Sequence, residues 1–173
     1  MSERIGDKQK LLDKALISGN FIFASGAKAR LKFDFDKIGT GSEEWDIAVN
    51  GLAGLIRENF HNIDAIVTVA NGAIRLGDPI ATDLAVVHIP TARTDTEPRQ
   101  FSVPGLIPEG VERVVIVDDV YTKGTNSTKV NDVLARQGLE AIGVVVVLDR
   151  SEDAHIPASP LYSIVKQYIE TYE

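Results

Sequence analysis

Cysteine is absent from this 173-residue chain, which excludes disulfide scaffolds, thiolate metal sites and cysteine nucleophiles. The absence also agrees with a reducing compartment. Residues 1–8 lack the apolar core of a secretory signal, and no segment approaches the roughly 20 apolar residues of a membrane span. We therefore expect a cytoplasmic protein with no membrane partner.

Basic residues are scarce as well, because 18 Lys and Arg face 25 Asp and Glu and leave a net charge of -7. Such a charge repels nucleic-acid phosphates and anionic lipid. Hydrophobic residues make up 44% of the chain, which is enough to close a core without metal or disulfide cross-links. We expect one domain over residues 1–173 and no nucleic-acid partner.

Several common catalytic signatures are also missing. His61, His88 and His155 are the three histidines, and they lie far apart without the spacing of metal ligands. The chain has no Gly-x-Ser-x-Gly nucleophile elbow and no Gly-x-x-x-x-Gly-Lys-Ser/Thr phosphate loop. These absences argue against a histidine metal centre, an α/β-hydrolase and a P-loop nucleotidase.

Four segments have the apolar spacing or the capping residues of helices. The expected helices cover residues 8–16, 42–60, 78–84 and 127–137. Gly19 stands where a C-terminal cap would follow the first helix. Asp78 and Pro79 would be the N-cap and first residue of the third.

The expected strands are of two kinds. Residues 29–35 alternate apolar with polar side chains, which predicts a half-buried strand. Residues 65–70, 85–89, 114–117 and 142–148 are almost continuously apolar, as in strands buried on both faces. Since these strands alternate with helices, the pattern predicts a Rossmann-like α/β fold with a parallel sheet flanked by helices. Ligands of such sheets bind at the carboxyl ends of the strands.

One long connection stands out between the buried strands. Residues 90–110 contain four prolines and no hydrophobic periodicity. Connections of this length are uncommon in compact domains unless they are functional or mobile. We therefore expect this segment to be functional or mobile, and residues 91–105 within it to form a lid that is mobile or disordered without ligand.

Residues 114–126 carry the clearest functional signal. Four apolar residues lead to Asp118 and Asp119, and the turn Thr122-Lys123-Gly124-Thr125-Asn126 then opens a helix. Backbone N–H groups of such a turn bind a phosphate at the helix N-terminus. Two carboxylates beside a phosphate are suited to accept hydrogen bonds from sugar hydroxyls or to hold Mg²⁺. The combination indicates a sugar phosphate ligand.

Two other interpretations of the acidic pair compete with this one. Asp118 and Asp119 can be solvated residues that cap a helix, although the phosphate turn behind them weighs against this. A receiver domain also has an apolar strand that ends in Asp-Asp. There the acidic pair opens the domain, whereas here too few residues follow it to complete that fold.

Residues 114–126 resemble the 5-phosphoribosyl-1-pyrophosphate (PRPP) motif of type I phosphoribosyltransferases. Three further segments narrow the resemblance to orotate phosphoribosyltransferases. Residues 19–28, 77–81 and 147–152 are similar to that family's Gly-x-Phe-x-Leu-x-Ser-Gly-x-Lys, Gly-Ile-Pro-Leu-Ala and Leu/Val-Asp-Arg-x-Glu segments. The resemblance implies the type I phosphoribosyltransferase fold, with an N-terminal hood at residues 1–40, a core at residues 41–173, and a homodimer.

The resemblance also implies a reaction. In it, phosphoribose passes from PRPP to a nucleobase with the help of Mg²⁺, and pyrophosphate is released. Orotate is the leading acceptor, and a purine or another pyrimidine is the alternative. A regulator that binds PRPP without turnover is the alternative from a different functional class.

The same resemblance assigns roles to individual residues. Asp118 and Asp119 would hold the ribose hydroxyls, and Mg²⁺ directly or through water. Arg93 and Arg99 would assist the departure of pyrophosphate as catalytic residues. The remaining PRPP-binding residues would be Tyr121, Thr122, Lys123, Gly124, Thr125, Asn126, Asn71, Gly72, Ala73 and Arg75. The base would contact Arg150, Phe33 and Lys28.

The three base-side residues have simpler interpretations too. Arg150 can be a surface arginine paired with Asp149 or Glu152. Phe33 can be an ordinary core residue of an alternating strand, and Lys28 can be solvated. These alternatives stay open at the level of the sequence.

The chain also departs from the family pattern at three places. Leu76 occupies the position of a lysine in the family's pyrophosphate loop, with Arg75 one residue earlier. In the long loop, residues 93–99 keep Arg93 and have Arg99 near the family's histidine, but lack both of its lysines. Ala24 stands where the family often has Lys or Ser.

Overall fold

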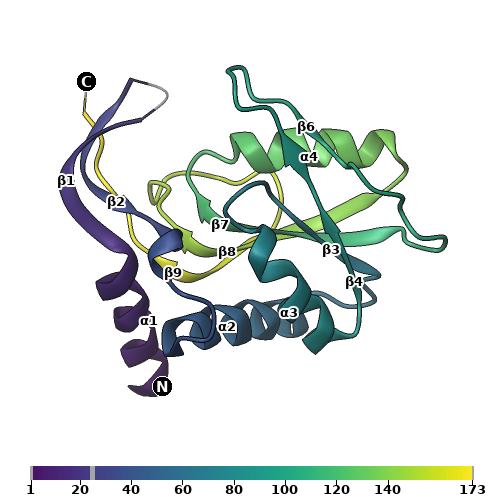
Figure 1. Cartoon of the computed structure of the whole chain (residues 1–173), viewed down its shortest axis with the longest axis horizontal. Helices are drawn as coiled ribbons and strands as arrows, with labels where there is room; N and C mark the ends of the chain where they lie inside the picture. Colours follow the sequence, from purple (N-terminus) through teal and green to yellow (C-terminus); the bar gives the residue numbers. More distant parts are fainter. Residues whose placement is uncertain (1, 24–25, 173) are drawn as a thin grey trace.

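The computed structural model describes residues 2–23 and 26–172, so Ala24 lies outside the described residues. Its centre is a five-stranded sheet in the order β4-β3-β7-β8-β9, in which every neighbouring pair is parallel (Figure 1). The strands are β3 (Ala65–Thr68), β4 (Val87–Pro90), β7 (Arg113–Tyr121), β8 (Glu140–Asp149) and β9 (Leu161–Lys166). The predicted fold class is confirmed.

Helices cover both faces of this sheet (Figure 1). The helices are α1 (Ser2–Ala15), α2 (Glu43–Asn59), α3 (Ile74–Leu84) and α4 (Thr125–Arg136). Val115 and Val117 of β7 pack into the core on the side of α1, α2 and α3, whereas Val114 and Ile116 pack into the core beneath α4. None of the described helices is long and apolar enough to cross a membrane.

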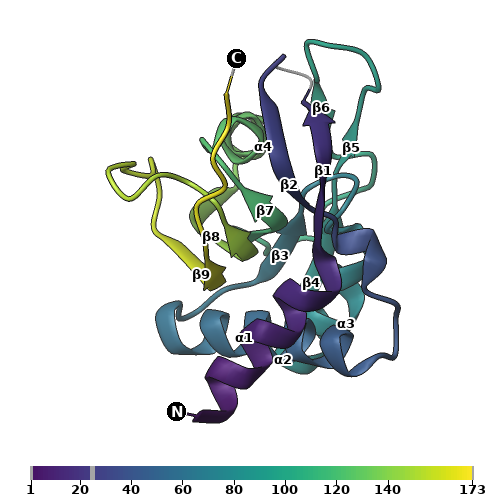
Figure 2. The same ribbon diagram turned by 90° about the vertical axis from the view of Figure 1, so that its left-hand side faces the viewer.

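An antiparallel N-terminal hairpin stands apart from the main sheet (Figure 2). It consists of β1 (Leu16–Ile22) and β2 (Lys28–Phe33), and the short 3₁₀ helix η1 (Phe35–Lys37) leads from it toward α2. Near the other end of the chain, Tyr172 pairs with Lys28 through two backbone hydrogen bonds of 2.7 and 2.9 Å. The last described residues therefore run beside the N-terminal hairpin.

The long connection contains regular structure that the sequence did not predict. The strands β5 (Ala92–Arg93) and β6 (Phe101–Ser102) pair antiparallel and form a small hairpin, which we call the 92–102 hairpin. Phe101 is buried in the core on the α4 side, and the Lys129 ammonium of α4 donates to the Arg99 carbonyl at 3.0 Å. The base of this hairpin is therefore attached to α4.

The predicted start of α3 is wrong. The helix begins at Ile74, so Asp78 is not its N-cap and Pro79 lies inside it. A proline inside a helix removes one backbone hydrogen bond. Buried apolar residues on both sides of it, Leu76 and Ile80, keep the helix packed on the sheet and compensate for that loss.

The first helix also differs from the expectation. It begins at Ser2 and ends at Ala15, and Gly19 lies within β1 instead of capping the helix. Neither β1 nor β9 was expected. β1 is mostly exposed, and β9 is an edge strand of mixed burial, so neither has the apolar pattern of a central strand.

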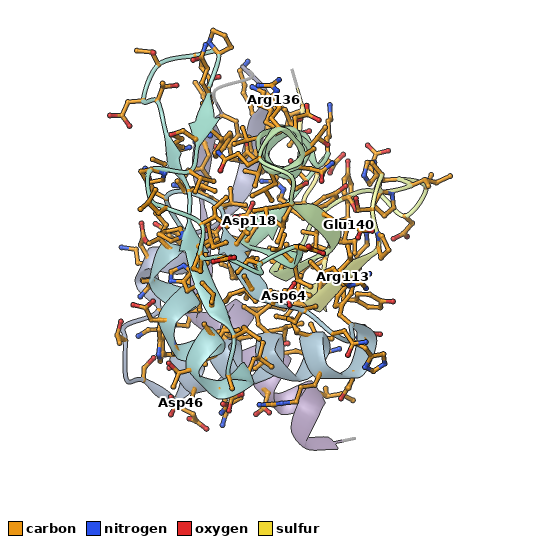
Figure 3. The ribbon with its side chains drawn as sticks, turned by 90° about the vertical axis from the view of Figure 1, so that its right-hand side faces the viewer. Asp46, Asp64, Arg113, Asp118, Arg136 and Glu140 are labelled. Carbon is orange, nitrogen blue, oxygen red and sulfur yellow. The ribbon has the colours of Figure 1, made fainter. Side chains whose placement is uncertain are left out.

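Charged residues at the amino ends of the central strands interact with neighbouring strands through hydrogen bonds and an ion pair (Figure 3). Asp64, just before β3, accepts hydrogen bonds from the backbone N–H groups of Glu112 and Arg113 at 3.0 and 2.9 Å, and these bonds lower the pKa of Asp64. Arg113 also pairs with Glu140 at 3.7 Å. Asp118 lies farther along β7, toward the carboxyl ends, where we located the candidate site.

Candidate functional site at the carboxyl ends of the strands

Asp118 and Asp119 lie near the end of β7, between the buried strand interior and the following turn. Asp118 is only 8% exposed, and its Oδ1 accepts a hydrogen bond from the Asp119 backbone N–H at 2.8 Å. Burial, together with the adjacent Asp119 carboxylate, raises the pKa of Asp118 well above its usual value. A cation or a hydroxyl donor placed at this pair would relieve the electrostatic cost of its charge.

The loop after β3 packs directly against this pair. Val69 donates its backbone N–H to the Val117 carbonyl at 3.0 Å, which ties the start of the loop to β7. A Cβ atom built on Gly72 would overlap the carboxylate of Asp119. Only glycine therefore allows this backbone to approach the acidic pair so closely. The structure thus brings the predicted residue Gly72 beside Asp119, with Asn71 and Ala73 adjacent to it in the loop.

The turn after β7 leads into α4, as expected. Gly124 is the N-cap with φ of 78°, a left-handed conformation that glycine adopts without strain. Within the described part of the chain no side chain caps the helix, so its first backbone N–H groups have no side-chain acceptor there. Thr122, Lys123 and Thr125 are exposed around this N-terminus. The arrangement suits the binding of a phosphate.

The side chain of Tyr121 packs against this turn at Gly124. Its side chain is buried, and its hydroxyl lies so close to Gly124 that a Cβ atom there would overlap it. The hydroxyl is 3.0 Å from His155 Nε2, and burial with the nearby Asp149 carboxylate raises the pKa of Tyr121. Tyr121 was predicted as a PRPP-binding residue; the structure places its ring beneath the turn.

The two arginines of the 92–102 hairpin have different surroundings. The charge of Arg93 lowers the pKa of Asp118, against the larger effects of burial and Asp119 that raise it. The Arg93 Nε is buried with no hydrogen-bond partner among the described residues. Arg99 instead pairs with Glu97, with 3.0 Å between Arg99 Nε and Glu97 Oε1. The structure therefore brings Arg93, and not Arg99, into electrostatic contact with Asp118.

Arg150 follows β8 and faces the N-terminal hairpin. The Arg150 guanidinium lies 4.8 Å from the ring centroid of Phe23, and burial lowers the pKa of Arg150. Among the described residues it forms no ion pair with Asp149 or Glu152; Asp149 pairs with Lys166 at 3.0 Å. The interpretation of Arg150 as a surface ion-pair residue is therefore not supported.

The other predicted ligand-binding residues are engaged elsewhere or exposed. The Arg75 guanidinium donates to the carbonyls of Phe35 and Ile38 at 2.6 and 2.7 Å and stacks on Phe35 and Trp45. Phe33 is 6% exposed within the main core. The side chain of Lys28 is exposed on the N-terminal hairpin.

Sequence reasoning missed several residues around this site. Phe23, the stacking partner of Arg150, precedes the undescribed residues 24–25 in a segment without strand periodicity. His155 and His88 were considered only as metal ligands, although each contacts a hydroxyl of a β-strand residue at the site. Hydrogen-bonding partners this distant in sequence have no local pattern that would reveal them.

The residues present fit Mg²⁺ as a partly hydrated ion. Among residues 2–23 and 26–172, no group of three or more His, Asp or Glu side chains could hold a metal. Two adjacent carboxylates, one of them buried with a raised pKa, are nevertheless a favourable partial ligand set for a divalent cation. Mg²⁺ usually takes one or two protein carboxylates and completes its shell with water and substrate phosphates. Asp118 and Asp119 match that pattern.

Comparisons with known proteins agree with this geometry. The phosphoribosyl transferase domain model matches residues 42–170. An orotate phosphoribosyltransferase of Caldanaerobacter subterraneus subsp. tengcongensis is 30% identical over 96% of this chain and 88% of its own length. The crystal structure of orotate phosphoribosyltransferase from Aeropyrum pernix superposes with a TM-score of 0.75 at 26% identity, covering 91% of this chain and 92% of that one.

A protein named for a different role is also similar to this chain. The transcriptional regulator GfcR of Methanocella arvoryzae is 25% identical over 77% of this chain and 70% of its own length. Sequence similarity of this order therefore spans proteins named as enzymes and a protein named as a regulator.

Proposed function

This chain belongs to the phosphoribosyltransferase family, and from that premise we propose that it transfers phosphoribose from PRPP to orotate in an Mg²⁺-dependent reaction. The observation that carries the proposal is the joint placement of three elements at one sheet edge. The acidic pair of β7, the Gly72 loop after β3 and the uncapped N-terminus of α4 lie around the same point. They match the hydroxyls, the pyrophosphate and the 5-phosphate of PRPP in charge and hydrogen-bonding type.

The phosphate end of the ligand is assigned to the turn of α4. Thr122, Lys123, Gly124, Thr125 and Asn126 surround the 5-phosphate with backbone N–H groups, hydroxyls and one ammonium. Asn71, Gly72 and Ala73 present the backbone of their loop to the pyrophosphate. Asp118 and Asp119 accept hydrogen bonds from the ribose hydroxyls.

The base is assigned to the space between Arg150 and the N-terminal hairpin. A guanidinium placed over the Phe23 ring can keep its N–H donors for a planar anion. Orotate has a carboxylate that matches such a donor pair. This assignment favours orotate over a purine or a neutral pyrimidine.

In the reaction, the bond from ribose C1 to the pyrophosphate oxygen breaks, and its electron pair leaves with pyrophosphate. A ring nitrogen of the base donates the electron pair of the new bond to C1, and the proton of that nitrogen is lost to water. The protein orients the two reactants and excludes water from a carbon that gains positive character. Arg93 stabilises the charge that grows on the departing pyrophosphate. Mg²⁺, when bound, neutralises phosphate charge and stabilises the leaving group.

The test measures pyrophosphate release from PRPP and Mg²⁺ with a panel of bases. We expect release with orotate and little with adenine, hypoxanthine or uracil. Arg150→Ala should weaken orotate binding by roughly 1.5 to 3 kcal/mol while PRPP binding is kept. Unchanged orotate affinity in Arg150→Ala would argue against an acidic acceptor and favour a purine or a neutral pyrimidine. The homodimer implied by the family stays a prediction, to be checked by light scattering.

A second candidate, a regulator that binds PRPP without turnover, rests on one specific observation. Arg75 and Arg99, two of the cations predicted for the pyrophosphate, are engaged by groups of the protein itself. Only Arg93 then remains of the three arginines to assist departure. PRPP binding by calorimetry without pyrophosphate release on any base would favour the regulator.

A further inference from the structure

Two sets of hydrogen bonds that meet at Thr68 connect an exposed carboxylate on α3 with the loop beside the acidic pair, one through the Thr68 hydroxyl and one through its backbone carbonyl. Asp78 Oδ1 is 2.7 Å from His88 Nδ1, and His88 Nε2 is 2.8 Å from Thr68 Oγ1. The Thr68 carbonyl accepts the hydroxyl of Thr91 at 2.8 Å, and Thr91 Oγ1 accepts the backbone N–H of Ala70 at 3.0 Å. Ala70 immediately precedes the loop residues Asn71 and Gly72.

The surroundings show that these hydrogen bonds are built into the fold. A Cβ atom on Gly77 would overlap the His88 ring, so glycine makes room for the imidazole against α3. Thr68 and Thr91 are 0% and 2% exposed, whereas the side chains of His88 and Asp78 are 10% and 91% exposed. A fully buried Thr68 hydroxyl cannot reach a substrate, so the Asp-His-Thr arrangement is not a nucleophilic triad.

The hydrogen-bond roles follow from the carboxylate at one end. Asp78 can only accept when it is charged, so His88 Nδ1 donates to it. In the tautomer with its single proton on Nδ1, Nε2 accepts from the Thr68 hydroxyl. The orientation of the Thr68 side chain at the end of β3 is thereby fixed. The backbone carbonyl of the same residue accepts the Thr91 hydroxyl, whose oxygen accepts the Ala70 N–H, so the two sets of hydrogen bonds are joined through the covalent bonds of Thr68.

We propose that Asp78 and His88 are positioning residues that fix the conformation of residues 69–73 and, through the contact of Gly72 with Asp119, the orientation of the acidic pair. Only the expected effect on PRPP binding rests on the proposed function. The effect of Asp78 and His88 on the conformation of residues 69–73 concerns the free protein and can be tested without a ligand. Groups that orient the ligands of a bound ion commonly influence its binding about 10- to 100-fold when they are removed.

The first test measures amide hydrogen exchange of residues 70–74 in the free protein. Asp78→Ala should speed exchange at Ala70 and in the following loop by about tenfold, whereas Asp78→Asn, whose amide oxygen still accepts from Nδ1–H, should restore most of the protection. Asp83→Ala is the matched control, because it also removes a carboxylate from α3. The carboxylate lost there pairs with Arg57 at 2.5 Å and not with His88. Equal exchange in Asp78→Ala and in the parent would overturn the inference.

The second test separates positioning from a general loss of stability. The ¹⁵N signals of His88 should report a proton on Nδ1 in the parent and a shift toward the other tautomer in Asp78→Ala. PRPP with Mg²⁺, measured by calorimetry, should bind about tenfold more weakly to Asp78→Ala and normally to Asp83→Ala. Should the parent bind no PRPP, the proposed function fails, but the exchange comparison still decides whether Asp78 and His88 fix the loop. Faster exchange in Asp83→Ala as well would assign the effect to α3 stability and reject the positioning role.

Discussion

At the scale of single residues, the two arginines of the 92–102 hairpin, Arg93 and Arg99, differ in the groups that surround their side chains. Arg93 is close enough to the acidic pair to change the pKa of Asp118, and its buried Nε has no partner among the described residues. Arg99 is held by Glu97 through its side chain, and its backbone N–H also donates to that carboxylate at 3.1 Å. Of the two arginines predicted to be catalytic, we therefore propose Arg93 for that role.

The substitution Arg93→Ala tests this proposal. If Arg93 stabilises departing pyrophosphate, turnover should fall by about 10²-fold, on the order of 2.7 kcal/mol, with little change in PRPP affinity. Arg99→Ala is the matched control and should keep most of the turnover, because an exposed ion pair contributes about 0 to 1 kcal/mol. Steady-state kinetics and calorimetry give both quantities. Equal turnover in Arg93→Ala and the parent would remove this residue from the mechanism.

The acidic pair predicts a pH dependence of stability. The pKa of Asp118 is raised in the folded protein above its usual 3.8, so the folded state binds more protons than the unfolded chain between the two values. The free energy of unfolding should therefore decrease as pH rises from about 4 through the folded-state pKa. Asp118→Asn keeps an oxygen acceptor for the Asp119 N–H and removes the buried charge. At pH 7.5 it should be more stable than the parent by roughly 1 kcal/mol, with the difference vanishing near pH 4.

Urea unfolding at several pH values provides the measurement. The same variant should lose affinity for PRPP with Mg²⁺, because one of the two candidate carboxylate ligands is gone. A variant that is destabilised equally at all pH values would contradict the assigned cause of the raised pKa.

At the scale of elements, Arg75 joins α3 to the segment that follows the N-terminal hairpin. Its guanidinium binds the carbonyls of Phe35 and Ile38 and lies 4.8 Å from the Trp45 ring centroid. Charged hydrogen bonds of this kind contribute about 1.5 to 3 kcal/mol, and the stacking adds to them. Arg75 thereby fixes η1 against α2 and α3.

Arg75→Ala should lower the free energy of unfolding by roughly 2 to 3 kcal/mol. Since Trp45 is the single tryptophan of the chain, its fluorescence should also change in the folded state. Arg57→Ala is the control, because it removes an exposed α2 ion pair with Asp83 and should cost about 0 to 1 kcal/mol. Similar losses in the two variants would show that Arg75 is an ordinary surface arginine.

Strands and helices that are deeply buried could be predicted from the sequence, whereas the exposed strand β1 and the edge strand β9 could not. Strands buried on both faces, such as β7 and β8, were evident because an apolar run has little other explanation. Ser42 was predicted as a helix start, and it accepts the Trp45 N–H at 3.1 Å as an N-cap. The edge strand β9 and the exposed strand β1 lacked such a pattern, since their pairing is decided by neighbours that are distant in sequence.

The candidate site was predictable only where its residues are contiguous. The acidic pair and the turn after it lie on one strand and one helix start, so their proximity follows from the sequence. The partners of Arg75 and Arg150 come from a different part of the chain, and no spacing rule links them. The contact of Gly72 with Asp119 depends on how two neighbouring parallel strands end, which the sheet order determines.

At the scale of the whole molecule, the proposed ligand should stabilise the fold. A ligand that binds only the folded state adds about 2.7 kcal/mol when present at one hundred times its dissociation constant. Millimolar PRPP with Mg²⁺ should therefore raise the melting temperature in a thermal scan. Ribose 5-phosphate should give a smaller shift, because it engages the turn of α4 without the pyrophosphate contacts. The absence of any shift with PRPP would exclude a PRPP site.

The pairing of Lys28 with Tyr172 has a consequence for the order in which the molecule is completed during synthesis. The N-terminal hairpin leaves the ribosome early, whereas β9 and Tyr172 follow all other described elements. The backbone partners on the Tyr172 side of Lys28 are therefore missing until residue 172 has been synthesised. A nascent chain can form the β3-β7-β8 pairs first, and the N-terminal hairpin gains its bridge to Tyr172 only afterwards.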